Sequence, residues 1–358
     1  MRNRLVRVPM ILATLWGCTW QPEAAPAIEA EAAAVTRDQM MKGARKLVSV
    51  STDVQPGENV LIVADGPMRS IAEVLAAAVV ERGAEPVIAV IRQRGVDATE
   101  PPPAVAAAMK SSDVIFSSVS ISITHTQAIK DALAAGARAI ALTAFTEEMM
   151  ASGGIDGDFV RIREDCETVG DRLSGAKIAR ITSPSGTELT FSVEDRRVNV
   201  MPGIAGPGQL SPVPNAEVNV SPVEGTANGT LVVDASIPYL GIGLLKQPIR
   251  FTVRDGMITD IEGGDPEQVE KLRSAWREQA DPNVYNIAEV GIGMNPMCQF
   301  KGLMLEDEGV LGSIHIGTGT SITLGGTVKA RSHYDLIMRA PTLTLDGEVL
   351  IQDGQIRT

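Results

Sequence analysis

Runs of apolar and polar residues divide the first part of the chain into short segments of strand and helix type. The predicted strands are residues 59–63, 86–91, 113–116 and 137–142, and the predicted helices between them are residues 70–82, 103–110 and 127–135. The first of these strands, residues 59–63, is mostly a continuous apolar run, as expected of a buried parallel strand. Regular alternation of strand and helix predicts βαβ units with right-handed crossovers. We therefore expect an α/β domain with a doubly wound parallel sheet over residues 36–174.

The pattern changes near residue 175, where short strand-like segments follow one another with few helices between them. Strands are predicted at residues 180–182, 188–193, 231–233 and 249–253. The dipeptides Asp255-Gly256 and Asp346-Gly347 are typical hairpin turns. One helix is expected at residues 266–279, with Asp265 as its N-cap. Residues 202–214, rich in Gly and Pro, are expected to form a loop. These features predict a β-rich α+β domain over residues 175–358.

The first 35 residues allow two interpretations. Arg2, Arg4 and Arg7 precede an apolar run over residues 8–17, and Cys18 follows that run. The segment is either an extension ahead of a cytoplasmic protein or the signal segment of an exported protein or envelope lipoprotein. Membrane association is expected only if Cys18 carries a lipid, because the apolar run is too short to span a bilayer as a helix.

Composition narrows the class of protein. The 358 residues are 44% hydrophobic and 21% charged, which is typical of a globular chain long enough for two domains. The formal net charge of −12 argues against a nucleic-acid partner, which would need clustered basic residues. The three cysteines are far apart and show no zinc-ribbon spacing, so any metal is expected to have oxygen and nitrogen ligands. Neither a GxGxxG motif nor a P-loop is present, and we infer no nucleotide cofactor.

One short motif in this histidine-poor chain suggests a metal site. The chain has three histidines, and one of them opens the triplet His333-Tyr334-Asp335. Residues two apart on a strand project from the same face. His333 and Asp335 can therefore bind one cation together, although a structural hydrogen-bonded pair would give the same spacing.

Other candidate ligands occur earlier in the chain. Glu224 and Glu289 each have apolar or Gly/Pro neighbours rather than a charged face, and His315 stands in the segment Ile314-His315-Ile316-Gly317. A carboxylate buried in such surroundings needs a partner. Together with His333 and Asp335, these residues form a set able to hold two divalent cations. His125 follows a predicted strand and precedes a helix, where such sheets present functional groups or where a capping histidine would stand.

Four ordered segments carry a resemblance to a known family. Pro222-Val223-Glu224-Gly225, the run from Ala288 to Pro296, Ile314-His315-Ile316-Gly317 and the run from His333 to Ile337 resemble the catalytic half of the aminopeptidase T family of metallopeptidases. The resemblance implies two metal ions, and it implies the ligands Glu224, Glu289, His315, His333 and Asp335. It also implies a homodimer.

The same fold family includes the 2,5-dihydroxypyridine 5,6-dioxygenases, which the chain resembles over most of its length. In that branch one Fe(II) is bound by two histidines and an aspartate. His333 and Asp335 match the last two ligands, whereas Glu289 stands at the position of the first histidine. The branch also uses a histidine from its first domain, which implies a role for His125.

We therefore expect a metal-dependent hydrolase of amide or peptide bonds, with two Zn, Co or Mn ions activating a water. Glu289 is expected to bridge the ions, and His125 is expected to act as an acid/base or to orient a peptide or small-molecule substrate. Lys329 and Arg331 are either ligands of a substrate carboxylate or part of a solvated strand edge. The alternative enzyme is an Fe(II)-dependent ring-cleaving dioxygenase. A third interpretation is a binding protein that retains the fold without catalysis.

Overall fold

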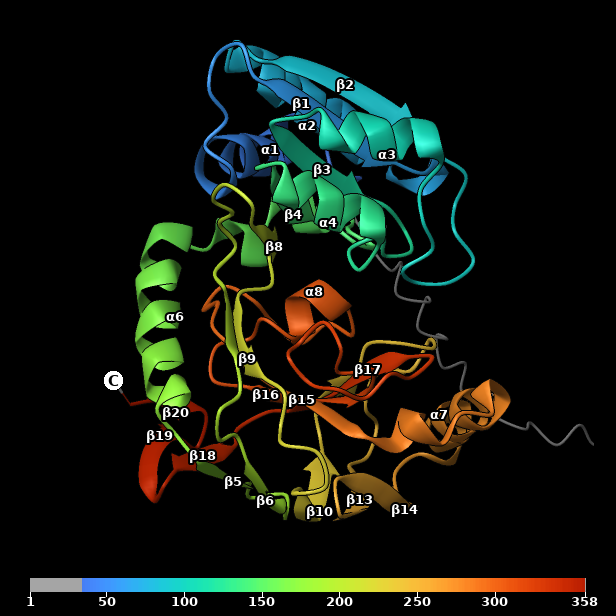
Figure 1. The fold of residues 1–358 in the computed structure, drawn as a ribbon, viewed down its shortest axis with the longest axis vertical. Coiled ribbons are helices and arrows are strands. Elements are labelled where there is room, and N and C mark those ends of the chain that lie inside the picture. The colour runs from blue at the N-terminus through green and yellow to red at the C-terminus, as the bar shows by residue number, and fades with distance from the viewer. Residues whose placement is uncertain (1–33, 358) are drawn as a thin grey trace, which may run out of the picture. The chain divides into compact units, whose positions relative to one another are not determined.

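The computed structural model describes residues 34–357, and residues Val35–Thr358 form one compact unit (Figure 1). The expectations for Cys18 and for the segment before it fall outside the described residues. In the described part of the chain, no helix combines the length and the apolar character needed to cross a membrane.

A five-stranded parallel sheet forms the first part of this unit, in the order β2-β1-β3-β4-β8. Its strands are β1 (Asn59–Ala64), β2 (Glu85–Val90), β3 (Val114–Ser118), β4 (Arg138–Ala141) and β8 (Leu210–Pro212). The helices of this part are α1 (Arg37–Lys46), α2 (Arg69–Glu81), α3 (Pro103–Lys110), α4 (Gln127–Ala134), α5 (Glu147–Ala151) and α6 (Phe159–Ser174). The predicted α/β architecture is confirmed, and α3 has the expected bounds.

Helices cover both faces of the parallel sheet because its central strands are apolar on both faces. Val60 and Ile62 of β1 pack into a large core with α1 and α2. Leu61 and Val63 of the same strand pack on the other side, with Met109 of α3 and residues of α4. Successive strand residues point to opposite faces, so a continuous apolar run can supply both cores.

The remaining chain forms two antiparallel sheets. The eight-stranded sheet contains β14 (Met257–Gly263), β13 (Ile249–Arg254), β10 (Asn228–Val233), β6 (Glu188–Ser192), β5 (Ile178–Thr182), β18 (Thr342–Leu345), β19 (Glu348–Gln352) and β20 (Gln355–Ile356), in that order. The seven-stranded sheet contains β12 (Gly243–Leu244), β11 (Ser236–Ile237), β17 (His333–Met338), β16 (Ile314–Gly319), β15 (Ile287–Gly293), β9 (Glu217–Val220) and β7 (Val198–Met201), in that order. This half is β-rich, as predicted.

Local signals in the second half are confirmed. Helix α7 (Pro266–Gln279) has the expected bounds, and the Asp265 side chain accepts a hydrogen bond from the Gln268 backbone N–H. At the turn between β13 and β14, Asp255 and Gly256 both have positive φ, as a type I′ turn requires. A second short helix, α8 (Met304–Asp307), lies between β15 and β16.

The structure differs from the prediction in residues 202–214, where a loop was expected. Strand β8 lies in this segment and pairs in parallel with β4. Strand β8 belongs to the first sheet although it follows residue 175. Helix α6 precedes residue 175 but packs against β7 and β9 of the second half. The proposed boundary between residues 174 and 175 stays a prediction, and these two elements reach across it.

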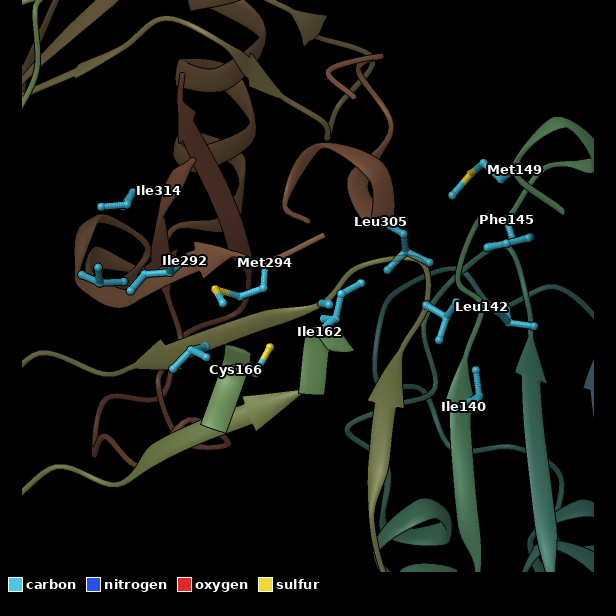
Figure 2. Packing of buried hydrophobic residues seen from close by; sticks show 14 of the residues in the cluster. Ile140, Leu142, Phe145, Met149, Ile162, Cys166, Ile292, Met294, Leu305 and Ile314 are labelled. Atoms are coloured by element: carbon cyan, nitrogen blue, oxygen red, sulfur yellow. The ribbon is translucent and has the colours of Figure 1, made fainter. Parts of the chain in front are cut away.

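One hydrophobic cluster connects the parallel sheet with the antiparallel sheets. It includes Ile140 of β4, Ile162 and Cys166 of α6, Ile292 of β15 and Leu305 of α8, all of which are buried (Figure 2). The seven-stranded sheet is thus held by apolar packing on α6 and α8, and its strands are a fixed support for the polar side chains described next.

Candidate metal centre

Polar side chains project from one face of the seven-stranded sheet. Glu289 of β15, Gly317 of β16 and Asp335 of β17 are direct neighbours in one row across three strands. His315 and Gly291 are paired in the adjacent row. Since residues two apart on a strand share a face, these rows bring carboxylates and an imidazole from three strands together.

Glycines make room for the two imidazole rings on this face. A Cβ built on Gly317 would overlap the His333 ring and would lie 2.7 Å from the Cβ of Glu289. A Cβ built on Gly291 would overlap the His315 ring. No larger residue at either position leaves the rings where they are, so the two glycines form a cradle for the histidines.

The first candidate ligand group consists of Glu289, His333 and Asp335, whose donor atoms lie within 4.8 Å of one another. The Nε2 of His333 is 2.8 Å from Oε2 of Glu289 and 3.3 Å from Oδ1 of Asp335. Its Nδ1 lies 2.8 Å from the carbonyl oxygen of Thr320, a contact in which the ring nitrogen donates. Nε2 faces the two carboxylates, and in the neutral ring this hydrogen bond leaves the lone pair on Nε2.

Two atoms of this group lack hydrogen-bond partners. The Nε2 of His333 and the Oδ1 of Asp335 are buried and make no hydrogen bond with good geometry. Buried polar atoms are normally satisfied, and exceptions need an explanation. A divalent cation between these atoms and Glu289 would satisfy both, so the residues fit a metal ion.

A second candidate group shares Glu289 and adds Glu217 and His315. The Nε2 of His315 is 3.5 Å from Oε2 of Glu217 and 3.9 Å from Oε1 of Glu289. The Nδ2 atoms of Asn215 and Asn219 donate to the two oxygens of Glu217, at 2.8 and 2.7 Å. Glu289 thus turns one oxygen toward each histidine, as a carboxylate shared by two groups would.

A tyrosine and a further glutamate extend the polar network beneath Asp335. The hydroxyl of Tyr239 lies 2.7 Å from Oδ2 of Asp335 and 2.9 Å from Oε1 of Glu308. Asn215 donates to the other Glu308 oxygen at 3.3 Å. Because the phenol has one proton and two carboxyl neighbours, one of its contacts needs a proton from a carboxyl group.

Burial and charge divide the four carboxyl groups into two kinds. Burial is the largest influence on all of them and acts to raise the pKa. At Glu289, His315 and His333 outweigh burial and lower the pKa of the carboxyl. The same two histidines outweigh burial at Asp335 and lower the pKa of that carboxyl as well. For Glu217 and Glu308 burial prevails, and it raises the pKa of Glu308 well above its ordinary range. Glu308 is therefore the carboxyl group that is protonated and donates a hydrogen bond to the Tyr239 hydroxyl.

The two histidines respond in the opposite way. Burial acts to lower their pKa, but the neighbouring carboxylates outweigh it. The pKa of His315 is raised to about 10, with Glu289 and Glu217 as the main causes. The pKa of His333 is raised well above its ordinary value, mainly by Asp335. Two imidazolium charges balance two carboxylate charges, and a bound cation would replace the imidazolium protons.

His125 lies between β3 and α4, as expected. The residue is accessible to solvent although protein surrounds its ring. The next residue, Thr126, caps α4 by accepting a hydrogen bond from the Ile129 N–H. Desolvation lowers the pKa of His125, and the positive charge of His333 lowers it further. The charge of His333 therefore reaches His125, which contributes to neither ligand group.

Four of the five predicted metal ligands meet on this face, and Glu224 does not. Its carboxylate pairs with Arg196 and accepts hydrogen bonds from the backbone N–H and the hydroxyl of Thr327, at 2.7 and 2.9 Å. These partners hold the Glu224 carboxylate, which belongs to neither ligand group. Glu217 contributes to the second group instead. The alternation Asn215, Glu217, Asn219 along one strand face was the signal available in the sequence.

The basic candidates near the triplet have other partners. The Arg331 guanidinium donates to the carbonyl oxygen of Gln279 at 2.7 Å, and its backbone N–H donates to Asp281 at 3.0 Å. The carbonyl oxygen of Lys329 accepts from Asn283 at 2.9 Å. Both residues lie in the exposed loop before β17; Arg331 has a structural partner for its side chain, and the Lys329 contact involves only its backbone.

The fold and this donor set define the class of the protein, an enzyme with a candidate metal site on one face of its seven-stranded antiparallel sheet. Residues 40–358 match the family model described as NicX, 2,5-dihydroxypyridine 5,6-dioxygenase, and the chain belongs to that family. A 2,5-dihydroxypyridine 5,6-dioxygenase from Pseudomonas putida is 28% identical over 162 residues, 42% of this chain. The match spans 45% of that relative, less than half of its length.

Two solved structures have the same fold. The 2,5-dihydroxypyridine dioxygenase from Pseudomonas putida KT2440 superimposes with a TM-score of 0.78 at 21% identity, covering 91% of this chain and 99% of that one. Wild-type AmpT from Thermus thermophilus gives a TM-score of 0.62 at 14% identity, covering 90% of this chain and 100% of that one. Both branches named from the sequence therefore share this fold, and the family match favours the dioxygenase branch over the hydrolase that the sequence led us to expect first.

Proposed function

We propose that this protein is a metal-dependent dioxygenase that opens an electron-rich, hydroxylated aromatic ring of the dihydroxypyridine class. The match of residues 40–358 to the dioxygenase family carries the proposal. The buried, unpaired Nε2 of His333 and Oδ1 of Asp335 support a cation at this face. This proposal adopts the alternative from the sequence in place of the hydrolase.

Glu289, His333 and Asp335 would hold the metal, for which we propose Fe(II). This set has one imidazole and two carboxylates, rather than the two histidines and one carboxylate of the common facial triad. When bound, Fe(II) would supply the one-electron chemistry that allows O₂ to react with an aromatic ring. The ring bond breaks and both oxygen atoms enter the product, so the reaction needs no external reductant.

The residues of the chain have separate tasks in this proposal. The Thr320 carbonyl keeps the proton of His333 on Nδ1, so that Nε2 remains a ligand. His125, on the loop after β3, would accept the proton of a substrate hydroxyl on its imidazole nitrogen. Its lowered pKa favours the neutral form that can do so near neutral pH.

The test is anaerobic reconstitution of the full chain with Fe(II), followed by addition of 2,5-dihydroxypyridine and oxygen. We expect one iron per chain and one O₂ consumed per ring opened. Iron-loaded protein that binds the metal but consumes no O₂ with any dihydroxypyridine would overturn the dioxygenase.

One observation favours a two-metal hydrolase as the second candidate. Glu289 turns Oε1 toward His315 and Oε2 toward His333, an arrangement suited to bridging two ions. Two Zn, Co or Mn ions per chain, with cleavage of peptide amides and no oxygen uptake, would support this candidate over the dioxygenase.

A further inference from the structure

Tyr239 holds one oxygen of the candidate metal ligand Asp335. The tyrosine follows β11 in a loop beside β17, and its hydroxyl lies 2.7 Å from Oδ2. The other oxygen, Oδ1, makes no hydrogen bond and lies 3.3 Å from the Nε2 of His333. The two oxygens of one carboxylate are thus in different environments.

Tyr239 is itself fixed from two sides. Its hydroxyl lies 2.9 Å from Oε1 of Glu308, whose other oxygen accepts from Asn215. Its ring packs against that of Tyr334, with centroids 5.4 Å apart and planes at 46°. A hydroxyl that is anchored at both ends cannot follow Asp335 if the carboxylate rotates.

We propose that Tyr239 is a positioning residue that makes Asp335 bind the metal through Oδ1 alone. Rotation of Asp335 to chelate through both oxygens would break the Tyr239 hydrogen bond. One-oxygen binding would use fewer protein atoms as ligands, and outer hydrogen bonds of this kind hold a ligand in place. The inference rests on the proposed metal site and is independent of the reaction that the metal supports.

The test compares Co(II) binding to the full-length wild type and to Tyr239→Phe, which removes one oxygen and keeps the ring. We expect Co(II) affinity to fall by about 10- to 100-fold. We also expect the visible absorption of the bound ion to change as Asp335 reorients. Unchanged affinity and an unchanged spectrum in Tyr239→Phe would overturn the inference.

Tyr334→Phe is the matched control. It removes the same atom from the neighbouring ring, whose hydroxyl accepts a hydrogen bond from Gln279 instead of contacting a ligand. Its Co(II) affinity and spectrum are expected to match the wild type. A wild type that binds no Co(II) would reject the metal site itself, a result distinct from failure of the role given to Tyr239.

A second measurement leaves Tyr239 in place. The chain has three tyrosines, so 3-fluorotyrosine labelling gives three ¹⁹F NMR signals. Tyr285→Phe and Tyr334→Phe assign two of them and leave the third to Tyr239. Addition of Zn(II) is expected to shift the Tyr239 signal and to leave the signal of Tyr285, whose ring packs on Trp276, in place. A Tyr239 signal whose chemical shift does not change at saturating Zn(II) would contradict the inference.

Discussion

The imidazole of His333 occupies the space where a side chain on Gly317 would stand. This relationship explains why a strand in the middle of a sheet carries a residue with poor strand propensity at this point. Because β16 has no side chain at Gly317, the His333 ring from β17 can lie across this strand and reach Glu289.

Replacing Gly317 with Ala is expected to abolish metal binding, because the added methyl group must push the His333 ring away from Glu289. Overpacking of this kind costs roughly 1–3 kcal/mol of stability. Metal content per purified chain and thermal unfolding measure the two effects. Gly66→Ala is the control, since a Cβ there meets nothing within 4 Å. Full metal occupancy in Gly317→Ala would show that the cradle is dispensable.

Replacing Glu289 with Gln is expected to abolish activity and metal retention while the fold remains. The amide has the same shape, but it removes the negative charge that faces both His315 and His333. Metal analysis and circular dichroism measure occupancy and fold. Wild-type turnover in this variant is incompatible with a metal centre built on Glu289.

Glu224→Gln is expected to lower stability and to retain the metal. Burial acts to raise the pKa of Glu224, but hydrogen bonds from Thr327 and Arg196 outweigh it and lower the pKa. A group with a lowered folded pKa stabilises the protein above its unfolded pKa, about 4.3, and this contribution disappears as pH falls through the folded value. Denaturant unfolding should therefore show a difference on the order of 1 kcal/mol at pH 7. That difference should shrink below about pH 4. Loss of metal in this variant would mean that Glu224 is a metal ligand after all.

His125→Gln is expected to reduce turnover by about 10²- to 10⁴-fold, the usual range for loss of a general base, and to leave metal content unchanged. Protonation of His125 removes its capacity to accept a proton, so the rate falls as pH drops through the pKa of His125. Desolvation and the His333 charge lower that pKa, which puts the acid limb of kcat/KM below about pH 6.5. The limb should vanish in His125→Gln, and an identical pH profile in both proteins would exclude the role.

Glu308→Gln and Glu308→Ala are expected to differ. Glutamine can donate from its amide to Tyr239 and accept from Asn215, as the protonated carboxyl does, so stability should stay near the wild type. Alanine leaves Tyr239 and Asn215 with one partner fewer, at a cost of about 1–3 kcal/mol. Chemical denaturation at pH 7 compares the two variants. A glutamine variant as unstable as the alanine variant would mean that Glu308 is held as a carboxylate.

Much of the fold could be predicted because its signals are local. Apolar runs identified the strands of the parallel sheet, including the edge strand β2, which is largely exposed. Asp265 and the Asp-Gly dipeptides marked a helix start and two turns. The strand β8 was not predicted because it has only three residues, Leu210–Pro212, within a Gly- and Pro-rich segment. It becomes a strand only by pairing with β4, which lies far away in the sequence.

The sequence by itself determined that His333 and Asp335 share a strand face, since the two-residue period of a strand fixes that relationship without any partner. It also supplied Glu289 and His315 as candidates. Only the tertiary structure put Glu217 in the place where the sequence had led us to expect Glu224, and only it brought Tyr239 and Glu308 to Asp335. Those choices depend on which strands are neighbours and in what register, and on where Arg196 lies. Such contacts join residues far apart in the chain. The alternation of Asn215, Glu217 and Asn219 indicates a polar strand face, but it does not say which strands lie beside that face.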